Sequence, residues 1–195
     1  MGRRRRRRRV IFEADGTAAG DNPPPSRRRG RAPRIPNTAM ALRVPVVGEA
    51  APDFTLDTTA GKPVTLSSFR GQKVVLVAFF PLAFTSVCTA ELCSFTDDYA
   101  TFAEKGVEVI PVSVDMVPSL KAFKAQHNIS VELASDPRRD VSRAYGVLNE
   151  EKFFANRSYF LIDKRGDVRW LHVEPANGQR RENAELLAQI AKLAL

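Results

Sequence analysis

Apolar residues along the chain form two kinds of pattern, and the first predicts strands. Residues 74–80 are a continuous series of Val, Leu, Ala and Phe, as expected of a central strand covered on both faces. Residues 107–114 predict a second buried strand, directly followed by Asp115. Four shorter stretches have the composition or alternation of strands, and a turn-rich loop joins the last two: residues 52–56, 131–134, 158–162 and 168–173.

The second pattern is a helical spacing. Positions 88, 92, 95, 99 and 102 are apolar, at intervals of 4, 3, 4 and 3, which places them on one face of a helix that Gly106 ends. Further helices are predicted over residues 118–126, 138–145 and 182–195. Strand–helix–strand units followed by a hairpin and a final helix predict an α/β domain, with a central mixed β-sheet flanked by helices on both faces.

Residues 40–195 suit one domain, because 156 residues can bury a proper core. The longest uninterrupted apolar run, residues 74–84, has only 11 residues and contains Pro81. A run of that length is too short to cross a bilayer, so we expect a soluble body without a membrane partner. A cytoplasmic location is expected as well.

Charge divides the chain unequally. Residues 1–39 contain 12 Arg and 3 acidic residues, a net charge of +9, whereas residues 40–195 contain 18 Lys+Arg and 19 Asp+Glu, a net charge of −1. The basic excess therefore belongs to an Arg- and Pro-rich leader, which we predict to be disordered because it has no apolar face. Three interpretations of the leader stay open: a tail that binds a polyanion such as nucleic acid, an organelle transit peptide, and a start codon assigned too early, with Met40 as the true start.

The two cysteines, Cys88 and Cys93, are too few and too close together to staple a secreted fold. Cys88 follows the loop after a buried strand and lies in the first turn of the predicted helix. A helix N-terminus stabilises an anion, so a thiolate is favoured there and Cys88 is a candidate nucleophile. Thr85, three residues earlier, could direct its hydroxyl to the same point, and Glu91, one turn later, could hold a cation near the thiolate.

The segment Pro81-x-x-x-Thr85-x-x-Cys88 resembles the active-site signature of the peroxiredoxins, thioredoxin-fold peroxidases that reduce hydroperoxides through a cysteine sulfenic acid. Residues 51–54 resemble the usual opening of that family, and residues 156–163 resemble the strand that carries its second active-site residue. The resemblance spans residues 46–191. It implies a thioredoxin-like fold and a thiol peroxidase that acts on hydrogen peroxide and organic hydroperoxides.

The resemblance also implies a role for each matching residue. Cys88 would attack the terminal peroxide oxygen, and Thr85 would hydrogen-bond the peroxide. Arg157 would stabilise the thiolate and the developing negative charge. Pro81 would shield the thiol from water, and Glu91 would orient Arg157.

Cys93 occupies the position where the bacterioferritin-comigratory (Q-type) group carries its resolving cysteine. Residues 81–85 and 155–157 instead resemble the one-cysteine group called alkyl hydroperoxide reductase E. In an intact helix the Cα atoms of Cys88 and Cys93 would lie roughly 8–9 Å apart, beyond the ~7 Å limit for a disulfide. If Cys93 resolves Cys88, the first helical turns therefore have to unwind.

Electrons would come from thioredoxin, or from a low-molecular-weight thiol with a glutaredoxin- or mycoredoxin-like protein, and a homodimer is compatible with the sequence. No metal and no organic cofactor are expected. One rival function is a thiol–disulfide electron carrier without peroxidase activity, although its usual Cys-x-x-Cys is absent. Another is copper delivery, which the cysteine spacing and the positions of His127 and His172 fit poorly. The third is a nucleic-acid-associated antioxidant that the leader tethers to DNA.

Overall fold

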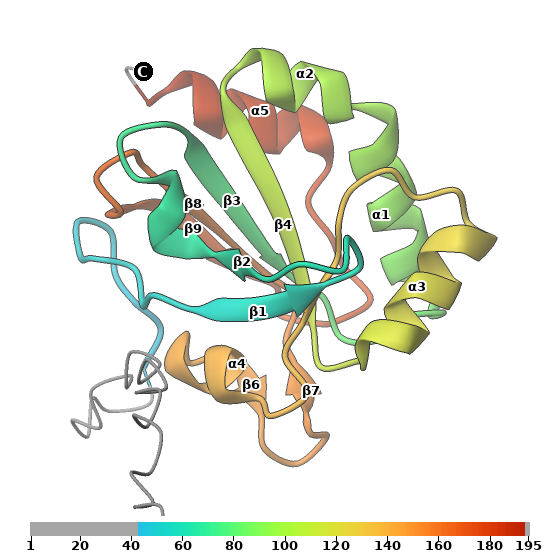
Figure 1. Ribbon diagram of the computed structural model, residues 1–195. Helices are drawn as coiled ribbons and strands as arrows, with labels where there is room; N and C mark the ends of the chain where they lie inside the picture. The colour runs from blue at the N-terminus through green and yellow to red at the C-terminus, as the bar shows by residue number, and fades with distance from the viewer. Residues whose placement is uncertain (1–42, 194–195) are drawn as a thin grey trace, which may run out of the picture. The chain divides into compact units, whose positions relative to one another are not determined.

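The computed structural model describes residues 43–193 (Figure 1). The predicted leader, residues 1–39, lies outside the described residues, so its disorder and the domain boundary at Met40 stay predictions. Within residues 43–193, no helix is long and apolar enough to span a membrane.

The sheet is mixed and has seven strands in the order β2-β1-β5-β4-β3-β8-β9. At its centre, β3 (Val74–Phe79) pairs in parallel with β4 (Val107–Ser113) and antiparallel with β8 (Ser158–Ile162). All six residues of β3 are buried, which confirms the prediction of a strand covered on both faces. The remaining strands of the sheet lie toward its edges: β1 (Thr55–Thr58), β2 (Val64–Thr65), β5 (Ala134–Ser135) and β9 (Val168–Val173).

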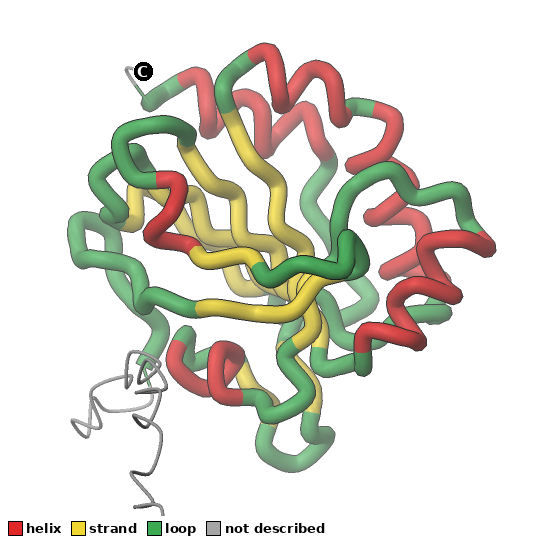
Figure 2. Tube along the Cα trace, in the orientation of Figure 1, coloured by secondary structure: helices red, strands yellow, loops and turns green. Residues whose placement is uncertain are grey.

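Helices cover both faces of the sheet, as predicted, but unequally (Figures 1 and 2). One face packs against four helices: α1 (Ser86–Asp97), α2 (Tyr99–Glu104), α3 (Val117–Gln126) and α5 (Asn183–Ala191). The other packs against α4 (Asp140–Ala144), the 3-10 helix η1 (Leu66–Phe69) and the segment that leads into β1. Alternate residues of β3 therefore enter two separate cores.

The continuous helix predicted through positions 88–102 is wrong in one respect. Asp98 leaves helical geometry, so α1 and α2 are separate helices, and Tyr99 is exposed rather than buried. The cause lies in α5, where the Asn183 side-chain amide donates to the Asp98 carboxylate at 2.8 Å and to the Ser94 carbonyl at 2.7 Å. A contact between distant segments thus decides where α1 ends.

Other differences concern the ends of elements. β1 begins later than the predicted strand over 52–56, and β5 has only two residues instead of the predicted 131–134. α4 is shorter than 138–145 because Arg139 has a left-handed backbone (φ 62°), and α5 ends at Ala191, before the predicted limit. A small hairpin, β6 (Leu148–Asn149) with β7 (Phe154–Ala155), was not predicted.

Candidate active site

The loop between β3 and α1 brings Cys88 to the carboxyl edge of the sheet. Ala83 in this loop donates its backbone N–H to the Asp115 carboxylate at 2.9 Å, and Asp115 follows the adjacent parallel strand β4. Thr85 then precedes α1 with an extended backbone, and its carbonyl accepts the N–H of Thr89 at 2.9 Å. Cys88 is the third residue of α1, as its predicted place in the first turn requires.

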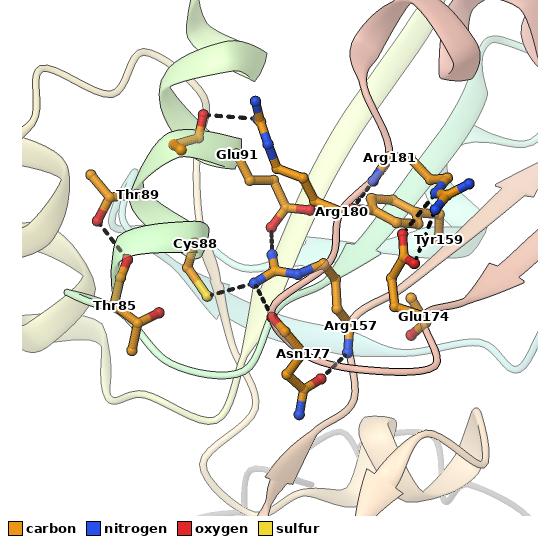
Figure 3. A network of polar contacts seen from close by, with 12 residues as sticks. Thr85, Cys88, Thr89, Glu91, Arg157, Tyr159, Glu174, Asn177, Arg180 and Arg181 are labelled. Carbon is orange, nitrogen blue, oxygen red and sulfur yellow. Dashed lines mark hydrogen bonds and ion pairs between the residues drawn. The ribbon is translucent and has the colours of Figure 1, made fainter.

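Arg157 reaches the same edge from β8. The antiparallel register pairs Phe79 with Ser158, so Arg157, one residue before β8, lies beyond the carboxyl end of β3. Its Nη2 donates to the Sγ of Cys88 at 3.1 Å (Figure 3). Both side chains are buried, with Cys88 1% and Arg157 0% exposed. A guanidinium in contact with a buried sulfur stabilises that sulfur as a thiolate.

Glu91 completes an ion pair with Arg157. Its Oε2 accepts from Nη1 of Arg157, while its Oε1 accepts from the phenol of Tyr159. Burial raises the pKa of Glu91 to about 7, although the charge of Arg157 and the hydrogen bond from Tyr159 both pull it down. Burial also acts against the charge of Arg157, but the negative groups of Glu91 and Cys88 outweigh it and raise the Arg157 pKa above its ordinary value.

Asn177, in the loop between β9 and α5, fixes the other side of Arg157. Its carbonyl accepts from Nη2 at 3.3 Å, and its side-chain oxygen accepts the Arg157 backbone N–H at 2.9 Å. The Nε–H of Arg157 is the one buried side-chain polar group without a hydrogen-bond partner in the described part of the chain. The guanidinium is thus held in place while one donor stays unused.

The structure brings together three of the residues that the sequence singled out, Cys88, Glu91 and Arg157. Pro81 is buried in the loop before α1. Thr85 is exposed, and its hydroxyl donates to the carbonyl of Leu82 at 3.0 Å instead of bonding Cys88.

Cys93 lies on α1 two residues after Glu91, and both cysteines have free thiols. The helix between Cys88 and Cys93 is intact, so a disulfide between them would require it to unwind. Within residues 43–193, no cluster of three or more potential metal ligands is present.

Sequence reasoning missed three residues that hold the site: Tyr159, Asn177 and Asp115. Tyr159 has the pattern of an ordinary buried strand residue, and its phenol has no signature in the sequence. Asn177 and Asp115 lie in loops, where only the tertiary structure shows which backbone groups they contact. The single available signal was that Asp115 directly follows a buried strand, at the edge where ligands bind in α/β sheets.

Comparison with known proteins gives consistent matches. The sequence profile described as "AhpC/TSA family" matches residues 47–171. The alkyl hydroperoxide reductase E of Mycobacterium tuberculosis is 40% identical over 130 residues, which cover 66% of this chain and 85% of that protein. A putative peroxiredoxin bcp of Coxiella burnetii is 36% identical over 128 residues, covering 63% and 84%. The solved structure of the mitochondrial 2-Cys peroxiredoxin from Plasmodium falciparum is 34% identical and superposes with a TM-score of 0.70 over 76% of this chain and 94% of that chain.

Proposed function

This chain belongs to the AhpC/TSA family of peroxiredoxins, enzymes with a thioredoxin-like fold, and from that premise we propose how its own residues perform the thiol peroxidase reaction. The family, the fold class and the enzyme class predicted from the sequence are confirmed. The roles of individual residues, the reductant and the substrate range are the proposal. Hydrogen peroxide and organic hydroperoxides are the proposed substrates, in keeping with the relative named alkyl hydroperoxide reductase.

In the first step the thiolate of Cys88 attacks the terminal oxygen of the hydroperoxide. A sulfur–oxygen bond forms and the oxygen–oxygen bond breaks. The departing alkoxide or hydroxide takes a proton from solvent, equivalent to the one that the Cys88 thiol released, and leaves as alcohol or water. The sulfur loses two electrons, which reduce the peroxide, and Cys88 becomes a sulfenic acid. The observation that carries this role is the 3.1 Å hydrogen bond from Arg157 to the Cys88 sulfur.

Arg157 is proposed to stabilise both the thiolate and the negative charge that develops on the leaving oxygen. Its unpartnered Nε–H leaves hydrogen-bonding capacity for a peroxide oxygen. Glu91 positions the guanidinium through its ion pair. Thr85 is proposed to bind the peroxide, with its hydroxyl oxygen accepting a hydrogen bond while its hydrogen stays on the Leu82 carbonyl.

Pro81 is proposed to keep water from the sulfur. It is buried in the loop before α1, and the sulfur it would protect is itself nearly inaccessible. Exclusion of water strengthens the electrostatic effect of Arg157 on the reacting atoms.

In the second step Cys93 is proposed to resolve the sulfenic acid. Its thiol sulfur bonds to the Cys88 sulfur, and the hydroxyl of the sulfenic acid leaves as water with the proton of the Cys93 thiol. A dithiol partner then returns two electrons by thiol–disulfide exchange. The proposed reductant is thioredoxin, or a low-molecular-weight thiol together with a glutaredoxin- or mycoredoxin-like protein, and a cytoplasmic location and a homodimer are proposed with it.

The test compares three variants under continuous turnover with hydrogen peroxide. Cys88→Ser is expected to abolish peroxide consumption with every reductant. Cys93→Ser is expected to lose turnover with thioredoxin and to keep a single stoichiometric reaction, because the sulfenic acid still forms. Thr85→Val keeps the side-chain shape and removes the hydroxyl, so it is expected to slow the reaction of Cys88 with peroxide. Full turnover by Cys88→Ser would overturn the proposal, and rapid disulfide exchange without peroxide activity would favour an electron carrier.

A further inference from the structure

The two carboxylate oxygens of Glu91 are held by two different partners. Oε2 accepts from Arg157, and Oε1 accepts from the phenol of Tyr159. Tyr159 lies on β8 and is 0% exposed, and Glu91 is 2% exposed, so neither group has water as an alternative partner. The hydrogen bond from Tyr159 therefore influences which oxygen of Glu91 pairs with Arg157.

The phenol is itself fixed from the segment that follows β9. Its oxygen accepts the backbone N–H of Arg181 at 3.1 Å. The Arg181 side chain pairs with the buried Glu174 at 2.8 Å, and the Glu174 backbone N–H in turn donates to the Arg157 carbonyl at 2.9 Å. Figure 3 shows these groups as one connected network that ends at Cys88. Because the phenol oxygen accepts from the Arg181 backbone, its own hydrogen is left to donate to the Glu91 carboxylate.

The two terminal nitrogens of Arg157 serve Glu91, Cys88 and the Asn177 carbonyl. Nη1 donates to Glu91, and Nη2 donates to the Cys88 sulfur at 3.1 Å. A carboxylate beside a guanidinium tends to form a bidentate pair that occupies two nitrogens at once. The two N–H groups of Nη2 already donate to the Cys88 sulfur and the Asn177 carbonyl, so such a pair would compete with the bond to the sulfur. In the structure Tyr159 holds Oε1 instead, and Glu91 pairs with Arg157 through Oε2 alone.

We propose that Tyr159 is a positioning residue of this peroxidase, whose phenol keeps Glu91 on one nitrogen of Arg157 so that the other stays on Cys88. The proposal rests on the roles proposed above for Cys88 and Arg157. Tyr159 acts through Glu91 and touches neither the sulfur nor the substrate.

Tyr159→Phe tests the proposal because it removes only the hydroxyl. The rate constant for oxidation by hydrogen peroxide is expected to fall about ten-fold or more, the usual scale for a lost hydrogen bond to a charged group. The pH profile of that rate constant is also expected to move to higher pH. Burial already raises the pKa of Glu91 to about 7, and loss of the phenol removes one of the groups that favour its ionised form.

The charged and titratable groups that face Glu91 come from three parts of the fold, and all except Tyr159 remain in this variant. They are Arg157 and Tyr159 at β8, Glu174 and Arg180 between β9 and α5, and, through its contact with Arg157, Cys88 on α1. The change in profile therefore isolates the phenol.

Tyr145→Phe is the matched control. Tyr145 is also 0% exposed, and its hydroxyl donates to the Pro52 carbonyl at 3.0 Å in the other core. Both variants lose one buried hydroxyl, so both are expected to lose thermal stability. Only Tyr159→Phe is expected to change the rate constant and its pH profile, which a merely structural role would leave unmoved.

A second pair of variants tests whether Tyr159 acts through Glu91. In a Glu91→Gln background no carboxylate is present to form the bidentate pair, so adding Tyr159→Phe is expected to change the rate constant less than two-fold. A fluorotyrosine at position 159 donates a stronger hydrogen bond with little change in packing, and it is expected to move the pH profile to lower pH. The pH profile of the fluorotyrosine protein tests the role of the phenol even if Tyr159→Phe does not fold.

The inference is overturned if Tyr159→Phe keeps the wild-type rate constant and pH profile within two-fold, or if it causes the same loss in the Glu91→Gln background. The inference is also overturned if fluorotyrosine at position 159 leaves the pH profile of the rate constant unchanged. A wild-type chain whose Cys88 is not oxidised by peroxide would overturn the proposed function, and this inference with it. A reactive wild type with an unaffected Tyr159→Phe overturns the inference alone.

Discussion

Oxidation is expected to unwind the first half of α1. Cys88 and Cys93 are separated by more than one full turn of this helix, and its geometry keeps their Cα atoms roughly 8–9 Å apart, beyond the ~7 Å that a disulfide allows. Treating the reduced protein with stoichiometric hydrogen peroxide forms this disulfide. The helix between the two sulfurs must then give up its regular geometry.

The structure sets the size of the effect. Unwinding exposes Cys88 and Leu92, which are 1% and 0% exposed, at a cost of about 3 kcal/mol. It also separates Glu91 from Arg157 and leaves a buried guanidinium without its partner, which costs about 3 kcal/mol more. The disulfide restricts the unfolded chain over a small loop, which stabilises the oxidised folded form by about 2 kcal/mol. The oxidised form is therefore expected to be less stable by about 4 kcal/mol, which lowers its Tm by roughly 10 °C.

Hydrogen–deuterium exchange followed by mass spectrometry measures the local change. Amides of residues 86–93 are expected to exchange faster in the oxidised protein, while those of β3 and β8 keep their protection. Peroxide-treated Cys93→Ser is the control, because it carries the oxidised Cys88 without a disulfide and keeps α1 folded. A disulfide that leaves both the exchange of α1 and the Tm unchanged would show that α1 does not unwind on oxidation.

Arg157→Lys is expected to lower the rate constant for oxidation by peroxide about 10²–10³-fold, because one ammonium cannot bridge Glu91 and the Cys88 sulfur as the guanidinium does. Stopped-flow kinetics measure this rate constant, and a loss below three-fold contradicts the prediction. Burial raises the pKa of Glu91 from 4.5 to about 7, so between these pH values the folded protein keeps a proton on Glu91 that the unfolded chain has released. The free energy of unfolding is therefore expected to fall by about 3 kcal/mol as pH rises through that window. Urea denaturation at several pH values checks this, and Glu91→Gln is expected to lack that part of the slope. Asp115→Ala is expected to loosen the loop at Ala83, lowering stability by about 1–3 kcal/mol and slowing the peroxide reaction; a variant with wild-type Tm and rate contradicts that role.

Much of the fold follows from local patterns. The Val/Leu/Phe run predicts β3, and the apolar spacing beginning at Cys88 predicts α1, because burial on both faces or on one face leaves a direct mark on the sequence. The division between α1 and α2 left no such mark. It depends on the Asn183 amide, which lies 85 residues further along the chain and reaches Asp98 only in the folded protein.

The candidate site shows the same limit. Cys88 and Glu91 are three residues apart on one helix, so their neighbourhood follows from helical geometry. Arg157 could be assigned only through resemblance to a family, because its approach depends on the register between β3 and β8. The phenol of Tyr159 could not be assigned at all, since a buried tyrosine on a central strand indicates core packing until its hydrogen-bond partner is known.

Whether Cys88 is the peroxide-reactive thiol can be measured from the intact mass of the reduced protein after one equivalent of hydrogen peroxide, in the absence of air. The wild type is expected to lose two hydrogen atoms as Cys88 bonds to Cys93. Cys93→Ser is expected to gain one oxygen atom that a sulfenic-acid reagent traps, and Cys88→Ser is expected to stay unchanged. A wild-type mass that does not change within seconds, or a Cys88→Ser variant that is oxidised as fast as the wild type, would contradict the account.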